Sequence, residues 1–299
     1  MDRFRAMTVY VAVAEEESFA AGARRLSMSP PAVTRIIAAL ERHLGAKLLT
    51  RTTRFVRATD AGRRYLEQAR RILAEVDEAD ESAAGAHSQP QGLLVVTAPV
   101  LFGRMYVMPG ILDFLRRFPA VSVSATLLDR VVNFLEEGID VGVRIGELPD
   151  STLHAIGVGH IRRIVCASPQ YLKRHGTPRV PADLAKHTIV AANAVTPSTD
   201  WRFGAGRNAV SVKVRPRLMV SNNEAAIIAA AEGFGVTRLL SYQVAPYLES
   251  GALRTVLTEH EPARLPVHVV HSEGRLASAK VRTFVDLLVS RLRADKALR

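Results

Sequence analysis

Apolar residues recur at helical spacing between Ser27 and Leu48, which predicts an amphipathic helix in this segment. One stripe of this helix carries its large apolar side chains and is expected to pack inward: Val33, Ile36, Ile37, Leu40 and Leu44. The opposite face combines small side chains with guanidinium groups and could approach an anionic surface closely: Pro31, Thr34, Arg35, Ala38 and Arg42. Ser29 is a candidate N-cap, and Pro30 suits a first turn where its missing N–H is harmless. An ordinary surface helix with solvated arginines is the alternative.

Two shorter helices are predicted before this one. Phe4, Met7, Val11 and Ala14 share one helical stripe, and the first helix should end in the acidic run at 15–17. Ser18 is a candidate N-cap for a second helix over 19–26, and 27–29 form a turn. Two short helices, a tight turn and a third helix with a small, basic outer face indicate a helix-turn-helix.

A basic hairpin is predicted after Gly45 ends the third helix. Residues 47–49 and 55–58 are expected to be short strands, and the turn between them carries Arg51 and Arg54. Basic residues beside such a helix are what contacts to DNA phosphates require, so the hairpin is interpreted as a wing. A plain surface hairpin is the alternative.

A long helix is predicted over 60–84, and Thr59 is its candidate cap. Its small and apolar residues alternate at spacings of three and four, as in a coiled-coil seam: Gly62, Tyr65, Ala69, Ile72, Val76, Ala79 and Ala83. We favour self-association along this seam, which would present two recognition helices to a two-fold operator. The alternative is that the stripe docks on its own domain.

The rest of the chain predicts an α/β domain. Residues 85–92 resemble a linker, and strand and helix patterns alternate after it, which implies a parallel sheet. Strands are expected at 93–98, 121–126, 140–146, 161–167, 188–191, 210–214, 236–239 and 267–271, and helices at 99–118, 131–137, 222–232 and 278–293. Two such sets suggest two lobes with a cleft. The predicted domains are 1–58, a linker at 59–91 and 92–299, with lobe one at about 92–164 and 268–299 and lobe two at about 165–267.

Composition narrows the class of protein. The 299 residues are 48% hydrophobic and 23% charged, which is globular, and the formal net charge of +11 favours polyanionic partners. A single cysteine, Cys166, excludes an internal disulfide and is expected to be a small buried hydrophobe in a strand. The N-terminus has no secretion signal and no apolar run is long enough to span a membrane, so a cytoplasmic protein without a membrane role is expected.

Several segments of the sequence together resemble one known protein family. The segment SFAAGARRLSMSPPAVTRIIAALERHLGAKLLTRTTRFVRATDAG resembles the DNA-binding region of LysR-type transcriptional regulators. LLVVTAPVLFGRMYVMPGILDFLRRFPAVSV, DVGVRIGEL and VSNNEAAIIAAAEGFGV look like the effector domain of that family, which is similar to periplasmic solute-binding proteins. The implied fold is a winged helix-turn-helix, a long linker helix and a two-lobed α/β effector domain. Leu49 replaces a frequent phenylalanine of the family, and Leu240 stands where a proline is usual, which puts the loop around Ser241 in doubt.

The resemblance implies a set of DNA-contacting positions. Those carried over are Pro30, Pro31, Thr34 and Arg35 on the recognition helix and Arg54 on the wing, where Arg51 also lies. Ser18 is a candidate phosphate contact because a helix N-terminus presents free amides. Arg35 is expected to matter most, since arginine can reach guanine or a phosphate.

The resemblance also implies an effector cleft between the lobes. The matching positions are Thr97, Ala98 and Pro99 after the first strand, Asp129 after the second, Arg144 and Ile145 at the end of the third, and Ser221, Asn222 and Asn223 at the next helix start. Helix starts bearing hydroxyl and amide groups would suit a carboxylate. Arg144 could pair with one, although an ion pair with a neighbouring acid is an equal alternative. Trp201 is expected in a lobe core rather than in the cleft wall.

The expected function is therefore a transcriptional regulator. Operator DNA, a small-molecule effector and a second copy of the chain are the implied partners, with the family's usual tetramer and RNA polymerase as further candidates. Neither cofactor nor metal is expected, because His154 and His160 lack other ligands at suitable spacing, and no nucleophile elbow or phosphate loop indicates an enzyme. The rival classes are a solute-binding module without a DNA role and an enzyme with a DNA-binding appendage.

Overall fold

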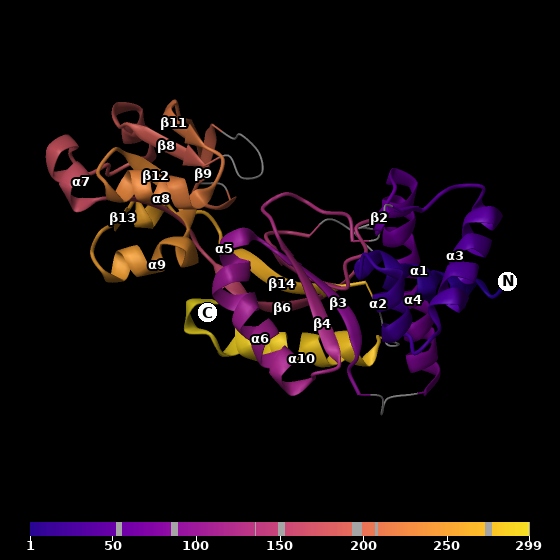
Figure 1. Cartoon of the computed structure of the whole chain (residues 1–299). Helices are drawn as coiled ribbons and strands as arrows, with labels where there is room; N and C mark the ends of the chain where they lie inside the picture. The colour runs from indigo at the N-terminus through magenta and orange to yellow at the C-terminus, as the bar shows by residue number, and fades with distance from the viewer. Residues whose placement is uncertain are drawn as a thin grey trace. The chain divides into compact units, whose positions relative to one another are not determined.

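In the computed structural model the chain divides into two compact units, Met1–Ser88 and Gln89–Arg299. The structure describes residues 1–51, 56–84, 89–134, 136–148, 153–192, 199–206, 209–272 and 277–298. Figure 1 follows the chain from the helices of the first unit to the two sheets of the second.

Three helices open the first unit: α1 (Arg3–Glu15), α2 (Phe19–Arg25) and α3 (Pro30–Leu44). Ser18 caps α2 as predicted, since its Oγ accepts the backbone N–H of Ala21 at 3.2 Å. Gly45 ends α3 in the left-handed conformation, with φ 65°, which glycine adopts without strain. Ser29 precedes α3 but makes no side-chain cap. Its carbonyl accepts the amides of Ala32 and Val33 instead, because prolines fill the first two helical positions.

The buried face of α1 differs from the prediction. Phe4 is exposed, and Met7, Val11 and Ala14 are only half-buried. The core is instead filled by Ala6, Val9, Tyr10, Ala12 and Val13. Tyr10 lies off the predicted stripe, yet its ring packs near Tyr65 and its hydroxyl donates to the carbonyl of Gly62 at 2.9 Å. A buried tyrosine with a partner for its O–H fixes which face of α1 turns inward.

The predicted stripe of α3 is confirmed for Val33, Ile37 and Leu40, which are fully buried. Ile36 is half-buried, and Leu44 is 39% exposed because the helix ends there. Glu41 takes a place on the buried face that the apolar pattern did not assign to it.

The wing strands are β1 (Leu49–Arg51) and β2 (Val56–Ala58), which pair antiparallel. The first strand begins two residues later than the predicted 47–49, because residues 47 and 48 bond to Glu41. Residues 52–55 of the turn, including Arg54, lie outside the described residues, as does the side chain of Arg51.

The long helix is α4 (Asp60–Ala84), and Thr59 caps it by accepting the amide of Gly62 at 2.9 Å. The start of its predicted seam packs on its own domain, which was the alternative. Gly62 and Ala69 are buried, and Tyr65 joins the core around α1. The helix α4 therefore belongs to the same compact unit as the helices before it, although the sequence predicted a separate linker over 59–91.

The second unit contains a five-stranded sheet of order β4-β3-β5-β14-β6. Its strands are β3 (Gly92–Ala98), β4 (Val121–Leu127), β5 (Val141–Ile145), β6 (His154–Ile161) and β14 (Leu265–His271). The predicted parallel arrangement is confirmed for β3, which runs parallel to β4 and β5, whereas β14 is antiparallel to both neighbours.

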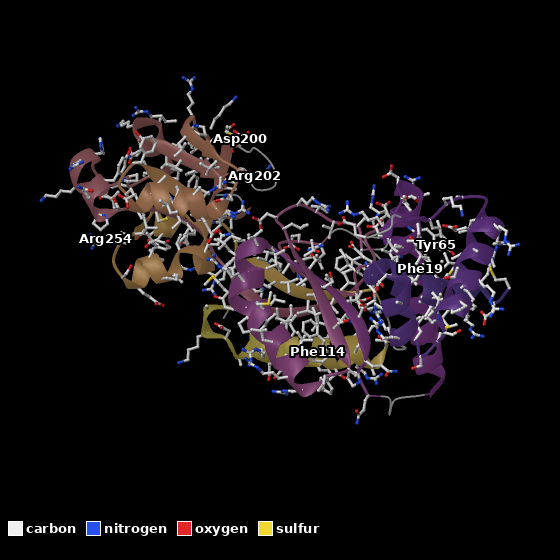
Figure 2. The ribbon with its side chains drawn as sticks, viewed as in Figure 1. Phe19, Tyr65, Phe114, Asp200, Arg202 and Arg254 are labelled. Carbon is white, nitrogen blue, oxygen red and sulfur yellow. The ribbon has the colours of Figure 1, made fainter. Side chains whose placement is uncertain are left out.

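A helical stretch and the last long helix pack together beside this sheet (Figure 1). The helical stretch contains α5 (Val100–Phe102), a π-helical turn η1 (Gly103–Val107) and α6 (Met108–Arg117). Pro109 lacks the N–H that a regular α-helix would require, which accounts for the wider turn before it. Phe114 of α6 packs edge-on against Phe284 of α10 (Ala279–Ala294), with ring centroids 5.2 Å apart (Figure 2).

The helix predicted over 131–137 is wrong. The described residues 131–134 and 136–138 form irregular structure and turns. Val132 and Phe134 are buried while Asn133 is exposed, and the chain turns after Phe134, whose carbonyl accepts the amide of Ile139 at 2.9 Å. These two side chains pack with Ile139 and Val270 in a small separate cluster.

The second sheet has the order β11-β8-β12-β7-β13. Its strands are β7 (Arg163–Ala167), β8 (Ile189–Ala192), β11 (Pro216–Val220), β12 (Val236–Leu240) and β13 (Arg254–Val256). A separate hairpin joins β9 (Asp200–Phe203) to β10 (Val210–Lys213), and the helices are α7 (Pro169–His175), α8 (Asn223–Ala231) and α9 (Ser241–Glu249). The sequence did not predict β9, β11, β13, α7 or α9, which are all short.

The chain crosses between the two sheets twice. The single strand predicted over 161–167 is two strands, because β6 ends at Ile161 and β7 begins at Arg163 in the other sheet. The return crossing lies between β13 and β14. Arg162 and Glu261 form an ion pair of 3.2 Å that joins the two crossings. The chain therefore passes from one sheet to the other two or three residues away from each predicted lobe boundary.

Candidate nucleic-acid interface and ligand cavity

The outer face of α3 is slim and basic. Pro30, Pro31 and Arg35 are exposed and Thr34 is half-exposed, on the side opposite the buried Val33, Ile37 and Leu40. Small side chains let such a face approach a grooved surface, and a guanidinium can bind a phosphate or a guanine edge there.

Glu41 fixes the end of α3 against the first wing strand. One carboxylate oxygen accepts the backbone N–H groups of Leu48 at 2.9 Å and Leu49 at 3.2 Å. The other accepts the ammonium of Lys47 at 2.7 Å. Burial alone would raise the pKa of Glu41, but these hydrogen bonds outweigh it and lower the pKa. The carboxylate therefore stays ionised and holds α3 and β1 in one orientation.

Glu15 ties three helices of the same unit together. Its carboxylate forms ion pairs with Arg25 of α2 and Arg70 of α4, both at 2.6 Å. Burial would raise the pKa of Glu15, but the hydrogen bonds from the two arginines lower it overall. The first turns of α4 are thereby fastened to the helices that present α3.

The other predicted DNA contacts are placed less completely. Ser18 uses its hydroxyl to cap α2 and remains partly exposed, so its position at a helix start is confirmed and its phosphate contact stays a prediction. Arg51 is placed by its backbone in β1, and Arg54 lies outside the described residues. Arg57, exposed on β2 opposite Thr50, is a basic wing residue that the sequence reasoning missed. The inside–outside alternation of the short strand could have identified it.

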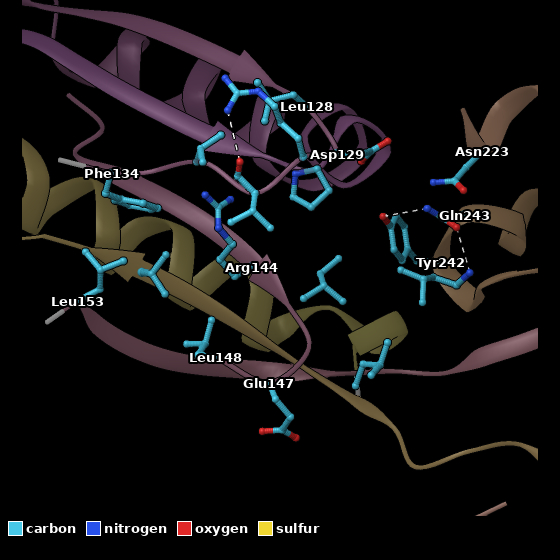
Figure 3. A pocket seen from close by; sticks show the side chains of 18 of the residues that line it. Leu128, Asp129, Phe134, Arg144, Glu147, Leu148, Leu153, Asn223, Tyr242 and Gln243 are labelled. Atoms are coloured by element: carbon cyan, nitrogen blue, oxygen red, sulfur yellow. Dashed lines mark hydrogen bonds between the residues drawn. The ribbon is translucent and has the colours of Figure 1, made fainter. Parts of the chain in front are cut away.

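A cavity of about 640 Å³ lies within the second unit, between residues of both sheets (Figure 3). Its volume lies in the range of small-molecule sites. Most of the wall is apolar and comes from Leu128, Val132, Phe134, Leu148, Leu240 and Leu265.

Five of the nine predicted effector positions line this cavity: Pro99, Asp129, Arg144, Ile145 and Asn223. Thr97 and Ala98 do not, because both are fully buried in β3, where the Thr97 hydroxyl donates to the carbonyl of Thr126 at 2.9 Å. Ser221 and Asn222 are exposed outside the lining. Of the three predicted residues at this helix start, only Asn223 lines the cavity.

Arg144 enters the cavity from β5 with unsatisfied hydrogen-bonding capacity. Its Nη1 donates to the carbonyl of Val143 at 3.1 Å, while its Nη2 is buried without a hydrogen-bond partner among the described residues. The guanidinium lies over the Phe134 ring, 5.1 Å from the centroid, and burial lowers its pKa. The alternative predicted for Arg144 was an ion pair with a neighbouring acid. Glu137 is the acid whose charge acts on the pKa of Arg144, and it is already paired with Arg130 at 2.8 Å.

Two backbone amides that could have bound an anion are already occupied. The Asp129 carboxylate accepts the N–H of Val100 at 3.1 Å, at the start of α5. The Asn222 side chain accepts the N–H of Ala225 at 2.8 Å, at the start of α8. Burial raises the pKa of Asp129, although the bond from Val100 opposes this shift.

Tyr242 and Gln243 also line the cavity and were missed by the sequence reasoning. Both are buried at the start of α9, where Gln243 accepts the N–H of Leu240 at 3.0 Å and donates to the Tyr242 hydroxyl at 3.4 Å. Leu240 replaces the family's proline, which hid the position of this helix. A glutamine three residues after a strand end was an available capping signal.

Two other predictions concern buried residues. Trp201 is 3% exposed in the core of the second sheet, with Arg238 stacked 4.8 Å above it, so its predicted core position is confirmed. Cys166 is fully buried in β7, as predicted, and burial raises the pKa of its thiol to about 12.

Where the chain is described, the structure shows no cluster of metal-ligating side chains, and His154 stacks on His271. Likewise, no helix in the described part is long and apolar enough to cross a membrane.

Both the helix-turn-helix region and the region that contains the cavity are similar to known proteins. Residues 4–63 match the bacterial regulatory helix-turn-helix protein model of the lysR family, and residues 87–293 match the LysR substrate binding domain. A transcriptional regulator of Xanthomonas campestris pv. campestris is 35% identical over 96% of this chain and 85% of its own length. The transcriptional activator TtdR of Escherichia coli K12 is 31% identical, covering 95% and 92%. The solved structure of CrgA, a LysR-type regulator from Neisseria meningitidis, is 30% identical with a TM-score of 0.61, covering 96% of this chain and 98% of CrgA.

Proposed function

The chain belongs to the LysR family of bacterial transcriptional regulators, and from this premise we propose how it reads DNA and which cavity senses its effector. A helix-turn-helix and an effector-binding domain make it a DNA-binding regulator that responds to a small molecule. The exposed outer face of α3 is the observation that carries the proposed DNA contact.

Operator DNA is bound by the recognition helix and the wing. Thr34 and Arg35 enter the major groove, and Pro30 and Pro31 allow close approach at the start of the helix. Ser18, Arg51 and Arg54 are assigned to phosphate contacts, which position the helix without reading sequence. The buried Glu41 supports this assignment, because it gives α3 and the wing one fixed geometry.

Regulation operates through an assembly of copies. The part of α4 beyond Ala69 pairs two chains into a dimer, which suits a two-fold operator, and the family's usual tetramer would bring four winged modules to one site. RNA polymerase is the further partner through which transcription would change, and the site of action is the cytoplasm. We assign no catalytic step to the chain.

The effector binds in the 640 Å³ cavity, at Pro99, Asp129, Arg144, Ile145 and Asn223. Thr97, Ala98, Ser221 and Asn222 support this site from behind rather than touching the ligand. Because the cavity is built from both sheets, an occupant can stabilise one arrangement of the sheets over another. That differential affinity is what couples ligand binding to DNA geometry.

Footprinting on the DNA beside its own gene tests the DNA assignment. Wild type should protect a discrete sequence, and Arg35→Ala should lose that protection while its melting temperature stays unchanged. Arg254→Ala removes an exposed guanidinium from the second unit and serves as the charge-matched control, with an unchanged footprint (Figure 2). Equal footprints for wild type and Arg35→Ala would defeat the assignment.

A further inference from the structure

We propose that the effector is a monocarboxylate with a largely apolar body, and that its acid group binds the Nη2 of Arg144. The inference rests on the proposed function, because it names the ligand class and the anchoring residue of the same cavity.

Arg144 is the group in the cavity wall with an unmet requirement. Its Nη2 is buried with no hydrogen-bond partner among the described residues, although its Nη1 is satisfied by Val143. A buried charged donor without a partner is costly, and an acid group placed against it would form a charge-assisted hydrogen bond. The stacking on Phe134 holds the guanidinium in place but offers no acceptor for Nη2.

At two helix starts beside the cavity, one first-turn amide already has an acceptor. The amide of Val100 already donates to Asp129, and the amide of Ala225 already donates to Asn222. An incoming carboxylate would have to displace an acceptor that the chain itself supplies. Competition with these two acceptors favours a side chain over these two amides as the anchor of the acid group.

Two other arginines line the cavity but do not require a ligand. Arg130 forms a two-pronged pair with Glu137, with both N–O distances at 2.8 Å. Arg163 is half-buried, but its nitrogens are not among the buried, unpartnered atoms of the described residues. Arg144 is thus distinguished from both by an unsatisfied atom rather than by charge alone.

The remainder of the cavity determines the rest of the ligand. Leu128, Val132 and Leu148 provide an apolar wall for the body of the molecule. Figure 3 shows Arg144 beside Phe134, while Asp129 and Asn223 line another part of the cavity. A second acid group placed there would meet the Asp129 carboxylate, so one acid group is favoured over two.

Thermal shift and calorimetry on the full chain test the proposal. The probes are benzoate, phenylacetate and hexanoate, their primary amides, and terephthalate as a diacid, each up to about 10 mM. At least one monoacid should raise the melting temperature of wild type. Its amide should bind at least about tenfold more weakly, because it lacks the charge that Arg144 recognises. Terephthalate should bind more weakly than benzoate.

Arg144→Gln should weaken binding of the active acid at least about tenfold and leave its amide unaffected. Arg254→Gln removes an exposed guanidinium outside the cavity lining and should change acid binding less than threefold. The unliganded Arg144→Gln protein should melt no lower than wild type, because the change removes a buried unsatisfied atom, and this shows that the variant folds.

Several results would overturn the proposal. They are equal binding of an acid and its amide, unchanged binding by Arg144→Gln, tighter binding of terephthalate, and the absence of acid-dependent stabilisation across the panel. Footprinting of wild type separates this failure from failure of the proposed function. If an amide binds and alters an intact footprint, the regulator stands and the monocarboxylate inference falls.

Discussion

Glu41 near the end of α3 accepts the backbone N–H of Leu48 at 2.9 Å, and this bond joins the recognition helix to the wing. Leu48 lies in the loop before β1 and is itself buried in the core of the first unit. The amide of Leu48 therefore lies against the apolar core, where a donor without an acceptor is costly.

Replacing the Glu41 carboxylate should destabilise the first unit. Glu41→Ala leaves the buried amides of Leu48 and Leu49 without acceptors, so we expect a loss of about 1–3 kcal/mol in the free energy of unfolding. Urea denaturation of the full chain, followed by circular dichroism, measures it. Glu67→Ala removes an exposed acid from α4 and should change stability by less than about 0.5 kcal/mol. Equal stabilities of the two variants would contradict this role.

Acid should weaken the same unit through Glu41. Its pKa in the folded chain is lower than the ordinary value of 4.5, so its contribution is fully present above that pH and is lost as the pH falls through the folded pKa. Urea midpoints measured between pH 7 and pH 3 should fall in the acid range. The fall should be shallower in Glu41→Gln, and an identical pH profile would assign the acid sensitivity to other carboxylates, such as Glu15.

Gly62 permits the close approach of α4 to the loop before β1. A Cβ added there would collide with the carbonyl of Leu48 and crowd the hydroxyl of Tyr10. Gly62→Ala should therefore destabilise the first unit by about 1–3 kcal/mol, despite the better helix propensity of alanine. Gly157→Ala is the control, since its Cβ would meet open space. The melting temperatures of both variants, compared with wild type, measure the effect. A Gly62→Ala protein that is more stable than wild type would contradict the close packing.

Cys166 should be unreactive in the folded protein. Burial raises its pKa to about 12, so almost no thiolate exists at pH 8 and the sulfur is out of contact with solvent. A coloured disulfide reagent should react with less than a tenth of the protein over an hour in buffer, and with all of it in urea. Rapid labelling of the folded chain would show that the second sheet opens readily.

The sequence predicted elements with strong periodicity and missed those whose identity depends on tertiary packing. α3 and α4 could be predicted because long apolar stripes and local caps such as Thr59 specify them. The prediction for 131–137 was wrong because Val132 and Phe134 are buried through irregular backbone and turns, and only their packing partners Ile139 and Val270 reveal this.

The sequence predicted part of the candidate site and missed the part that depends on tertiary packing. Arg144 and Asp129 could be located from strand ends, because ligands gather where strands run into loops. The sequence could not show that Asp129 accepts the amide of Val100, or that Arg144 is left with an unsatisfied nitrogen. Both depend on groups that meet only in the folded chain. Tyr242 was hidden for a similar reason, since a short helix leaves little periodicity to detect.

The docking of Gly62, Tyr65 and Ala69 onto α1 has a mechanical consequence. A helix whose opening turns form part of a hydrophobic core cannot pivot freely at that end. Torque applied to the distal turns of α4 must rotate α1, α2 and α3 together as one rigid body. In the proposed dimer, such a rotation would change the spacing between the two copies of α3 without deforming either helix-turn-helix.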